Sequence, residues 1–206
     1  MYGAVISEYG GSSVLKYKDS LDEPKPKANQ VLVEIRASSV NPIDLMKREG
    51  YGKSVFEKQR SNSFPWILGS DFAGTIKEVG SKVSRFSKGD EVWGCTSDPN
   101  RGCYAQYGVF NQDEMDFKPS NISFNEAASL PYVALTTWAA LIRWATLRPQ
   151  DIQNKKVFIQ AGAGGVGTFA IQLFSSWNCN IATTCSNKNR KLVEELATEC
   201  GMPYVN

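Results

Sequence analysis

The sequence predicts a protein of the α/β plus β class, in which a mostly antiparallel β-domain precedes the first half, βαβαβ, of a doubly wound parallel sheet. Three observations lead to this prediction. Short apolar runs broken by glycines fill the chain up to about residue 120, helical apolar spacing begins at Ser123, and strand and helix patterns then alternate. We expect the first domain to occupy residues 1–127 and the second to occupy residues 128–206.

The β-domain is predicted from short runs of alternating polarity. In the segment 31–36, VLVEIR, three apolar side chains lie on one face and Glu34 and Arg36 lie on the other, as in a half-buried strand. Two further strands are predicted in the runs GTIKEVGSKV and KGDEVWG. The polar stretch 51–63 is predicted to form a solvated loop, and a mobile lid over a site is the alternative.

The beginning of the helical region is marked by Ser123 and Glu126. The two residues form a capping box, in which the hydroxyl accepts from a backbone N–H of the first turn and the carboxylate reaches back to the cap. We expect this helix to end before Pro131. A second apolar helix, YVALTTWAALIRWA, is expected to follow and to end near Pro149.

Strand and helix patterns alternate beyond this point. The run KVFIQ is typical of a strand that is buried on both faces of a parallel sheet. After a group of glycines, apolar residues recur at helical spacing. A second strand, a second helix and the opening of a third strand are predicted in NIATTCS, KNRKLVEELATEC and PYVN. This order predicts half of a Rossmann-type sheet.

Composition excludes several classes of function. The 206 residues carry a net charge of +2 with acids and bases interspersed, so we expect no nucleic-acid partner. The absence of histidine removes a Ser-His-Asp triad and a histidine-ligated zinc. Five irregularly spaced cysteines indicate reduced thiols in a cytosolic or matrix protein. We see no apolar run that could span a bilayer, no secretory signal and no transit peptide.

A glycine-rich turn, GAGGVG, lies between a predicted strand and a predicted helix. Gly162 permits a tight turn, Gly164 lets the backbone approach a pyrophosphate, and Gly167 lets the helix pack closely on the sheet. The first N–H groups of the helix then favour negative charge. The pattern predicts a dinucleotide site, with a purely structural turn as the alternative. The predicted cofactor-binding residues of this turn are Gly162, Ala163, Gly164, Gly165, Val166 and Gly167.

The end of the second predicted strand indicates which dinucleotide is bound. A site selective for NAD carries Asp or Glu about 20 residues after the glycines, where it bonds the ribose hydroxyls. The window 182–188 contains no acidic residue. The hydroxyl of Ser186 and the charges of Lys188 and Arg190 suit the 2′-phosphate of NADP(H), which we predict as the cofactor. Alternatively, these cations only decorate a surface helix.

The runs SSVNPIDLMKREGYG, FPWILGSDFAGTIKEVG, FSKGDEVWG, EAASLPYVALTTWAAL and GAGGVGTFAIQLF follow one another along the chain. Together they resemble the medium-chain dehydrogenase/reductase superfamily, in its zinc-free quinone oxidoreductase branch. AASLPYVALT and GGVGTFAIQ resemble in particular the mitochondrial reticulon-4-interacting protein group. The resemblance implies a GroES-like substrate domain, a Rossmann cofactor domain and NADPH-dependent reduction of a small-molecule quinone or related enone. It also implies a mitochondrial location, a membrane-associated reticulon as partner and a homodimer of the full-length protein.

The resemblance also assigns site residues. The catalytic zinc positions of the superfamily fall on Asn41, Ser70 and Tyr132, which are not plausible zinc ligands, so we expect no metal. Without a metal, an activated acceptor such as a quinone or enone is favoured, because conjugation delocalises the charge that hydride addition creates. Asn41 and Tyr51 are the catalytic candidates, with loop packing as the alternative. Thr136 is expected to approach the nicotinamide ring.

A full member of the superfamily is longer than this chain. Its parallel sheet has about six strands, whereas this sequence carries about three. We therefore expect either a fragment of a longer enzyme or a truncated isoform. A non-catalytic interaction module, which retains the fold or part of the nucleotide binding, is the second functional hypothesis.

Asp44 is expected to be a structural acceptor that holds the loop around Asn41.

Overall fold

The computed structural model describes residues 1–59 and 64–199. The chain divides into two compact units, Met1–Tyr132 and Val133–Asn206, and each is described by itself. This division falls a few residues after the boundary that the sequence predicted. The assignment of a substrate domain to 1–127 and a cofactor domain to 128–206 stays a prediction.

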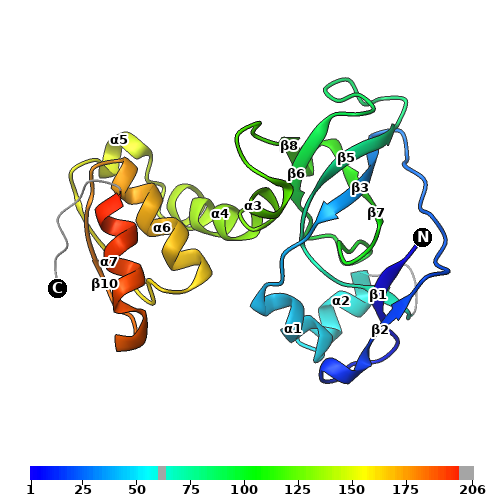
Figure 1. Ribbon diagram of the computed structural model, residues 1–206, viewed down its shortest axis with the longest axis horizontal. Coiled ribbons are helices and arrows are strands. Elements are labelled where there is room, and N and C mark those ends of the chain that lie inside the picture. The colour runs from blue at the N-terminus through cyan, green and yellow to red at the C-terminus, as the bar shows by residue number, and fades with distance from the viewer. Residues whose placement is uncertain (60–63, 200–206) are drawn as a thin grey trace. The chain divides into compact units, whose positions relative to one another are not determined.

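The first unit is built from two antiparallel sheets, as predicted (Figure 1). The larger sheet has the strand order β7-β3-β5-β6-β8, and the smaller has the order β2-β1-β4. The strands of the larger sheet are β3 (Gln30–Ala37), β5 (Asp71–Val79), β6 (Glu91–Cys95), β7 (Tyr107–Asn111) and β8 (Met115–Phe117). Those of the smaller sheet are β1 (Gly3–Ile6), β2 (Leu15–Lys18) and β4 (Trp66–Ile67).

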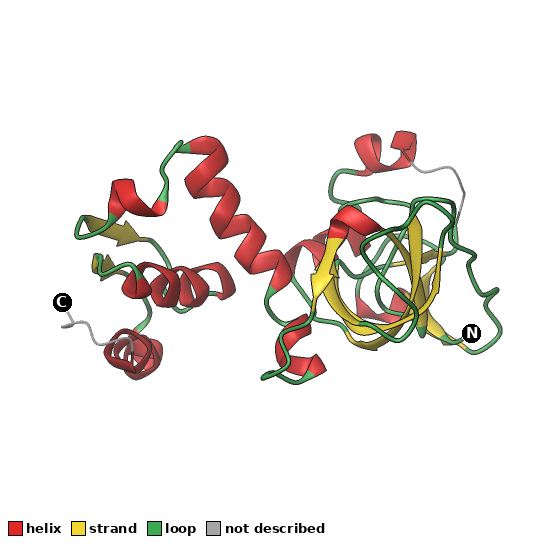
Figure 2. Cartoon of the chain, turned by 90° about the horizontal axis from the view of Figure 1, so that it is seen from above, coloured by secondary structure: helices red, strands yellow, loops and turns green. Residues whose placement is uncertain are grey.

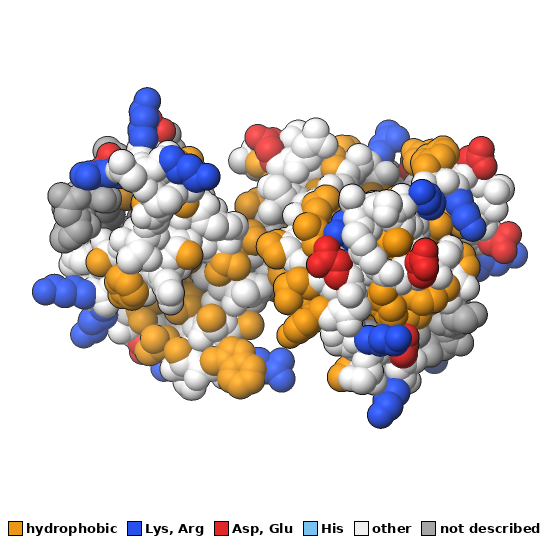
Figure 3. Space-filling view, turned by 90° about the horizontal axis from the view of Figure 1, so that it is seen from below, with side chains coloured by type: hydrophobic (Ala, Val, Ile, Leu, Met, Phe, Trp, Pro, Cys, Tyr) orange, Lys and Arg blue, Asp and Glu red, His pale blue; other side chains and the backbone are white. Residues whose placement is uncertain are grey.

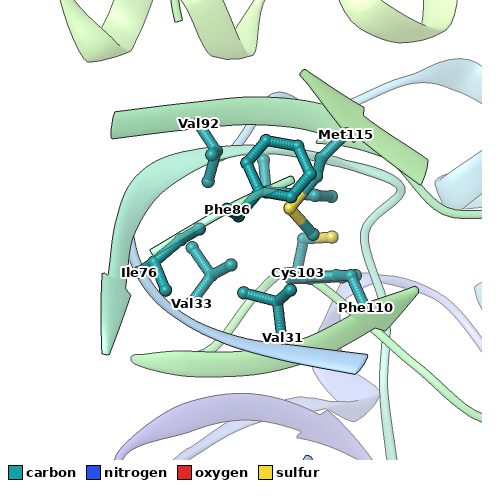
Figure 4. Packing of buried hydrophobic residues seen from close by; sticks show 9 residues of the cluster. Val31, Val33, Ile76, Phe86, Val92, Cys103, Phe110 and Met115 are labelled. Carbon is teal, nitrogen blue, oxygen red and sulfur yellow. The ribbon is translucent and has the colours of Figure 1, made fainter. Parts of the chain in front are cut away.

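An apolar core fills the interior of the larger sheet (Figure 4). The rings of Phe72 and Phe110 stack there, with centroids 3.7 Å apart. Val31 and Val33 of β3 face this core, as the alternation predicted. The same alternation predicted one exposed face for β3, and this is wrong at Leu32, whose side chain is also buried. Both faces of this part of β3 are therefore covered.

Short helices connect the strands of the first unit. The capping box at Ser123 is confirmed, because its N–H donates to Glu126 Oε2 at 2.8 Å and its Oγ accepts from the Glu126 N–H at 3.3 Å. A helix replaces part of the loop that was predicted over 51–63, since a stretch without Gly or Pro follows Gly52. Residues 60–63 lie outside the described part. The helical segments are η1 (Ser12–Val14), α1 (Pro42–Arg48), α2 (Lys53–Gln59), η2 (Gln112–Glu114) and α3 (Phe124–Ala128). A further helix, α4 (Pro131–Trp138), begins at the end of the first unit, and most of its residues belong to the second.

The second unit alternates strand and helix, as predicted (Figure 2). Its two described strands, β9 (Lys156–Ile159) and β10 (Asn180–Thr183), pair in parallel. The third strand that PYVN predicted lies outside the described residues. The helical elements that accompany the strands are the π-helical segment η3 (Ala139–Trp144), α5 (Pro149–Ile152), α6 (Gly165–Ser176), η4 (Asn187–Asn189) and α7 (Arg190–Glu199).

The core of the second unit lies where α6 packs against the two strands. Ala170, Ile171 and Phe174 of α6 meet Ile159 of β9 and Val193 of α7 in one buried cluster. The sequence predicted that β9 would be buried on both faces, and this is wrong, because Phe158 is 67% exposed. Within the described residues β9 and β10 form a sheet of two strands, so the face that carries Phe158 is left uncovered.

Candidate functional site

The glycine-rich turn leads from β9 into α6, where the sequence placed it. Its sharpest bend falls on Ala161, which adopts the left-handed conformation at φ 58°. Gly162 is not in that region, so the tight turn does not depend on Gly162 in the way that we predicted. The turn is attached to the end of β10, because Gly162 N–H donates to Thr184 O at 2.8 Å and Ala161 N–H donates to Thr184 Oγ1 at 3.1 Å.

Two of the three motif glycines are buried and are required by packing. A Cβ on Gly162 would lie 2.2 Å from Thr183 Oγ1. A Cβ on Gly167 would lie 2.4 Å from Ala161 O and 2.7 Å from Gly162 Cα. Gly167 therefore lets α6 pack closely on the preceding turn, which is the role that the motif predicted.

The remaining motif glycine, Gly164, is exposed and is not required by packing. A Cβ there would meet only Ala161 O, at 3.3 Å, and the backbone of Gly164 is extended at φ −81° and ψ 166°. An alanine would fit this conformation. Backbone strain does not explain a glycine at this position, and the one tight contact, with Ala161 O, is much looser than the contacts at Gly162 and Gly167. Close approach of an external ligand to the backbone would favour glycine here.

The N–H groups that begin α6 point out of the helix without a side-chain cap. Gly164 is the N-cap and has no side chain to accept from them. The Thr168 N–H donates to Gly164 O at 2.8 Å, so the N–H groups of Gly165, Val166 and Gly167 precede the first turn of helical bonds. Such a helix start attracts phosphate. Ala163 is half-buried, whereas Gly165 and Val166 are exposed.

The residues expected to read the 2′-phosphate follow the carboxyl end of β10. Ser186 is the N-cap of η4, and Ser186 and Lys188 are both exposed. Parallel pairing places the carboxyl ends of β9 and β10 at the same edge, where Thr184 also joins the two loops. Arg190 donates from Nε to Glu194 Oε1 at 2.7 Å along α7, so part of its guanidinium already serves a helix pair.

Thr136 lies exposed on α4. One turn earlier, Val133 Cγ1 lies 3.1 Å from the position that a Cβ of Gly165 would take. The start of α6 therefore packs against the same helix that carries Thr136. The neighbouring Thr137 is buried and donates to Val133 O at 2.9 Å, which is a structural role.

In the first unit, Asn41 immediately precedes α1 and is only 6% exposed. Its Nδ2 donates to Asp71 Oδ2 at 2.8 Å and to Ser39 Oγ at 3.2 Å. Asp71 begins β5, is completely buried, and also accepts from the Tyr132 N–H at 2.7 Å. Burial raises the pKa of Asp71, and its hydrogen bonds with Ser39, Asn41 and Tyr132 act in the opposite direction.

A second buried carboxylate, Asp44, holds the loop around Asn41, as expected. It accepts from the Asn41 backbone N–H at 2.9 Å, from Ser70 Oγ at 3.1 Å and from the Tyr104 hydroxyl at 3.0 Å. Burial raises the pKa of Tyr104, and the nearby carboxylate of Asp44 acts in the same direction. The three positions that the resemblance aligned with zinc ligands, Asn41, Ser70 and Tyr132, thus bond to Asp44 and Asp71.

Tyr51 lies elsewhere on the first unit. It follows α1, donates its backbone N–H to Met46 O at 2.8 Å, and is 58% exposed. Asn41 and Tyr51 therefore flank opposite ends of α1, and no described contact brings them together. Tyr104 is the phenol that the fold brings into the network around Asn41.

Sequence reasoning missed Asp71, Ser39 and Tyr104. One signal was available for Asp71, because an acidic residue at the start of the apolar run DFAGTI has to find buried donors. Tyr104 carried no such signal, since it contacts Asp44 across a separation of 60 residues.

Charges of both signs are mixed on the face drawn in Figure 3. Within residues 1–59 and 64–199, no group of three or more Cys, Asp or Glu side chains is arranged to hold a metal ion. Every helix in the same ranges is too short or too polar to cross a membrane. The predictions of no metal and of no nucleic-acid partner stay predictions.

Comparison with known proteins identifies the fold. Residues 27–123 match the alcohol dehydrogenase GroES-like domain. The mitochondrial NAD(P)H oxidoreductase RTN4IP1 of Danio rerio is 36% identical, over 97% of this chain and 54% of that protein. The quinone oxidoreductase of Coxiella burnetii is 36% identical with a TM-score of 0.84, over 100% of this chain and 62% of that structure. Mycobacterial Rv1454c complexed with NADPH is 25% identical with a TM-score of 0.76, over 98% of this chain and 56% of that structure.

The chain thus spans about half the length of the curated relatives that it matches. Its GroES-like region and partial Rossmann region follow the same order as in the solved structures, as the sequence predicted. The chain belongs to the medium-chain dehydrogenase/reductase family and is close to the RTN4IP1 oxidoreductases and the quinone oxidoreductases within it.

Proposed function

We propose that this chain is part of an oxidoreductase that binds NADP(H) at the glycine-rich turn before α6. The observation that carries the proposal is the contrast among the motif glycines. Gly162 and Gly167 are required by packing, whereas Gly164 is exposed and meets only one atom, at 3.3 Å. A ligand that approaches the backbone closely explains why this position has no side chain.

The residues around the turn fit the diphosphate of a dinucleotide. The N–H groups of Gly165, Val166 and Gly167 would donate to the phosphate oxygens, and the helix dipole of α6 favours the negative charge. Ala163 and Gly164 would lie beside the bound diphosphate. When bound, the nicotinamide supplies a hydride donor. Thr136 would then contact the cofactor from α4.

The preference for NADP(H) over NAD(H) follows from the rim after β10. Ser186 and Lys188 are exposed there, and the residues from Ala182 to Lys188 include no carboxylate that would repel a 2′-phosphate. Lys188 is the stronger candidate of the two cations, because Arg190 already pairs with Glu194. Two of the similar proteins support a nicotinamide cofactor, since one is named an NAD(P)H oxidoreductase and the other is complexed with NADPH.

A quinone or related enone is the proposed acceptor of the hydride. Such acceptors delocalise the charge that hydride addition creates, so hydrogen-bonding groups and water suffice to complete the reduction. The similarity to a quinone oxidoreductase supports this class. Asn41 and Tyr51 remain the proposed substrate-contacting residues. The Asn41 amide nitrogen lies 2.8 Å from Asp71 Oδ2 and 3.2 Å from Ser39 Oγ, so the side chain is held in place.

The location and partners of the whole protein are proposals on the same basis. A mitochondrial location is supported by the names of the curated relatives. The name reticulon-4-interacting protein, carried by a Caenorhabditis elegans relative, supports a reticulon as a partner. A homodimer of the full-length protein completes the proposal.

Titration of the chain with NADPH and with NADH tests the cofactor assignment. We expect NADPH to bind more tightly, and we expect Gly164→Ala to weaken NADPH binding at least about tenfold, because the methyl group displaces the diphosphate. Gly11→Ala is the matched control, since a Cβ at Gly11 meets nothing within 4 Å. Equal affinity for the two cofactors would defeat the NADP(H) assignment. If Gly11→Ala weakened NADPH binding as much as Gly164→Ala, the assignment of the site to the glycine-rich turn would be wrong.

The second candidate function is a non-catalytic interaction module. It is favoured by one observation, the name reticulon-4-interacting protein that the Caenorhabditis elegans relative carries. Hydride transfer from NADPH to a simple quinone separates the two candidates. Turnover by the 206-residue chain at an ordinary enzymatic rate would reject the module, and cofactor binding without turnover would favour it.

A further inference from the structure

Thr184, the first residue after β10, holds the glycine-rich turn with both its backbone and its side chain. Its carbonyl oxygen accepts the Gly162 N–H at 2.8 Å, and its hydroxyl oxygen accepts the Ala161 N–H at 3.1 Å. Thr183, the last residue of β10, lies against the same turn, because its Oγ1 donates to Ile159 O at 2.6 Å and lies 2.2 Å from the position that a Cβ of Gly162 would take. Two consecutive threonines therefore connect the end of β10 to the turn.

The hydroxyl of Thr184 acts on the residue of the turn that has the least favourable backbone conformation. Ala161 is left-handed at φ 58°, which brings the Cβ of an L-residue close to the following carbonyl oxygen. Ala161 is also exposed, so packing of its side chain does not offset this cost. Hydrogen bonds hold the residue instead, since Thr184 binds its N–H and its carbonyl oxygen accepts the Gly164 N–H at 3.0 Å.

The direction of the first amides of α6 depends on this bend. Ala161 O accepts from Gly164, the N-cap of α6, and would meet a Cβ on Gly167 at 2.4 Å. A change of Ala161 out of the left-handed region would redirect its carbonyl oxygen and the residues that follow it. The conformation of Ala161 therefore determines where the N–H groups at the start of α6 point.

We propose that Thr184 is a positioning residue of the cofactor site, whose hydroxyl holds Ala161 in the left-handed conformation and so keeps the first amides of α6 directed at the diphosphate. The proposal deepens the proposed function and rests on it for the identity of the ligand. The diphosphate is common to NADPH and NADH. Thr184 therefore contributes equally to the binding of both cofactors, whereas Lys188 is proposed to act on the 2′-phosphate alone.

Removal of the hydroxyl tests this role. Thr184→Val keeps the shape of the side chain and cannot accept the Ala161 N–H. We expect the affinities for NADPH and for NADH both to fall about fivefold, as for one lost hydrogen bond, so that the ratio of the two affinities is unchanged. Thr184→Ser keeps the acceptor and should bind both cofactors as the natural chain does. Thr75→Val, the same exchange in β5 of the first unit, is the matched control and should leave both affinities unchanged.

A glycine at position 161 should make the hydroxyl unnecessary, because glycine enters the left-handed region without the cost that alanine has. In the Ala161→Gly background, we therefore expect Thr184→Val to lower either affinity by less than about twofold. An undiminished loss in that background would overturn the proposal, since Thr184 would then act on the ligand or on another part of the site.

Hydrogen exchange at the Ala161 amide gives a readout that needs no cofactor. We expect this exchange to be about fivefold faster in Thr184→Val than in the natural chain, and unchanged in Thr184→Ser and in Thr75→Val. Equal exchange in the natural chain and in Thr184→Val would overturn the proposal, as would a loss of affinity confined to NADPH. If the natural chain binds neither NADPH nor NADH, the proposed function fails, and the exchange measurement alone decides whether the Thr184 hydroxyl holds Ala161.

Discussion

Single residues show which parts of the glycine motif serve the fold. The left-handed bend falls on Ala161, at φ 58°, and not on a glycine. Gly162 and Gly167 are glycines because Thr183 Oγ1 and Ala161 O occupy the space that a side chain would need. Among these three motif glycines, Gly164 is the one at which a methyl group would be least crowded, with Ala161 O at 3.3 Å. Packing within the chain therefore explains the glycines at 162 and 167, and ligand binding is the proposed reason for the glycine at 164.

The raised pKa of the Cys95 thiol is predicted to lower the free energy of unfolding of the chain at alkaline pH. Burial and Asp71 raise the pKa of its thiol from 9.0 to about 12. Above pH 9.0 the unfolded chain loses this proton while the folded chain keeps it, so stability falls as pH rises toward 12, by up to about 1.4 kcal/mol per pH unit. Cys95→Ser keeps a hydrogen-bond donor at this position and does not titrate in this pH range.

Urea unfolding at neutral and alkaline pH checks this prediction. The natural chain should lose more free energy of unfolding between the two conditions than Cys95→Ser does. The pKa values of the buried Cys103 and the half-buried Tyr104 are also raised, so the variant should retain part of the alkaline loss. An identical pH dependence in both chains would mean that the thiol at position 95 titrates normally.

At the scale of elements, the start of α6 is held by the turn before it. Gly167→Ala would place a Cβ 2.4 Å from Ala161 O, and the helix would have to move. We expect a loss of about 1–3 kcal/mol in the free energy of unfolding, as for overpacked sites. Gly164→Ala should change stability by less than about 1 kcal/mol, because the backbone of position 164 suits alanine.

Thermal or urea unfolding of the two variants provides the comparison. If Gly164→Ala proved as destabilising as Gly167→Ala, the argument that Gly164 serves a ligand would lose its basis. Gly164→Ala should therefore lose NADPH affinity while its free energy of unfolding is nearly unchanged, whereas Gly167→Ala should lose both.

The loop between β10 and α7 is predicted to select the cofactor. Lys188→Ala should weaken NADPH binding by about tenfold, because a charge-assisted bond to the 2′-phosphate is lost, and should leave NADH binding unchanged. Lys191→Ala is the control, since Lys191 is highly exposed and lies 3.6 Å from Glu195 along α7. Isothermal calorimetry measures both affinities. A parallel decrease for NADPH and NADH would place Lys188 outside the 2′-phosphate site.

Local sequence patterns predicted most of these elements because short-range chemistry determines them. The capping box at Ser123 and the placement of the glycine turn depend on neighbouring residues, and the alternation of strand and helix indicated the parallel pairing of β9 and β10. The helix α2 within 51–63 and the exposed face of Phe158 were not predicted. Burial of a strand face depends on which segments cover it, and a run of apolar letters carries no such information.

The same distinction applies to the candidate site. Asn41 was predicted from its place in a motif, but its side chain is held by Asp71, which lies 30 positions away. Tyr51 was chosen because it is close in sequence, whereas the fold brings Tyr104 to Asp44 instead. Contacts across such separations require the strand order of the first unit, which the sequence pattern does not contain.

At the scale of the whole molecule, two compact units carry two separate arrangements. The first holds the buried carboxylates Asp44 and Asp71, and the second holds the exposed start of α6. The chain spans 54% of the Danio rerio relative, so the activity of the whole protein is best tested on a form of full length as well as on this chain. Comparison of the two forms would show what the present residues achieve alone.

The most direct measurement is a backbone amide NMR titration of the 206-residue chain with NADPH. The account predicts that the largest shifts occur at the amides of Gly164, Gly165, Val166 and Gly167, smaller shifts occur at Ser186 and Lys188, and none occur in β2. Saturable binding that leaves the four amides at the start of α6 unshifted, or no binding at all, would contradict it.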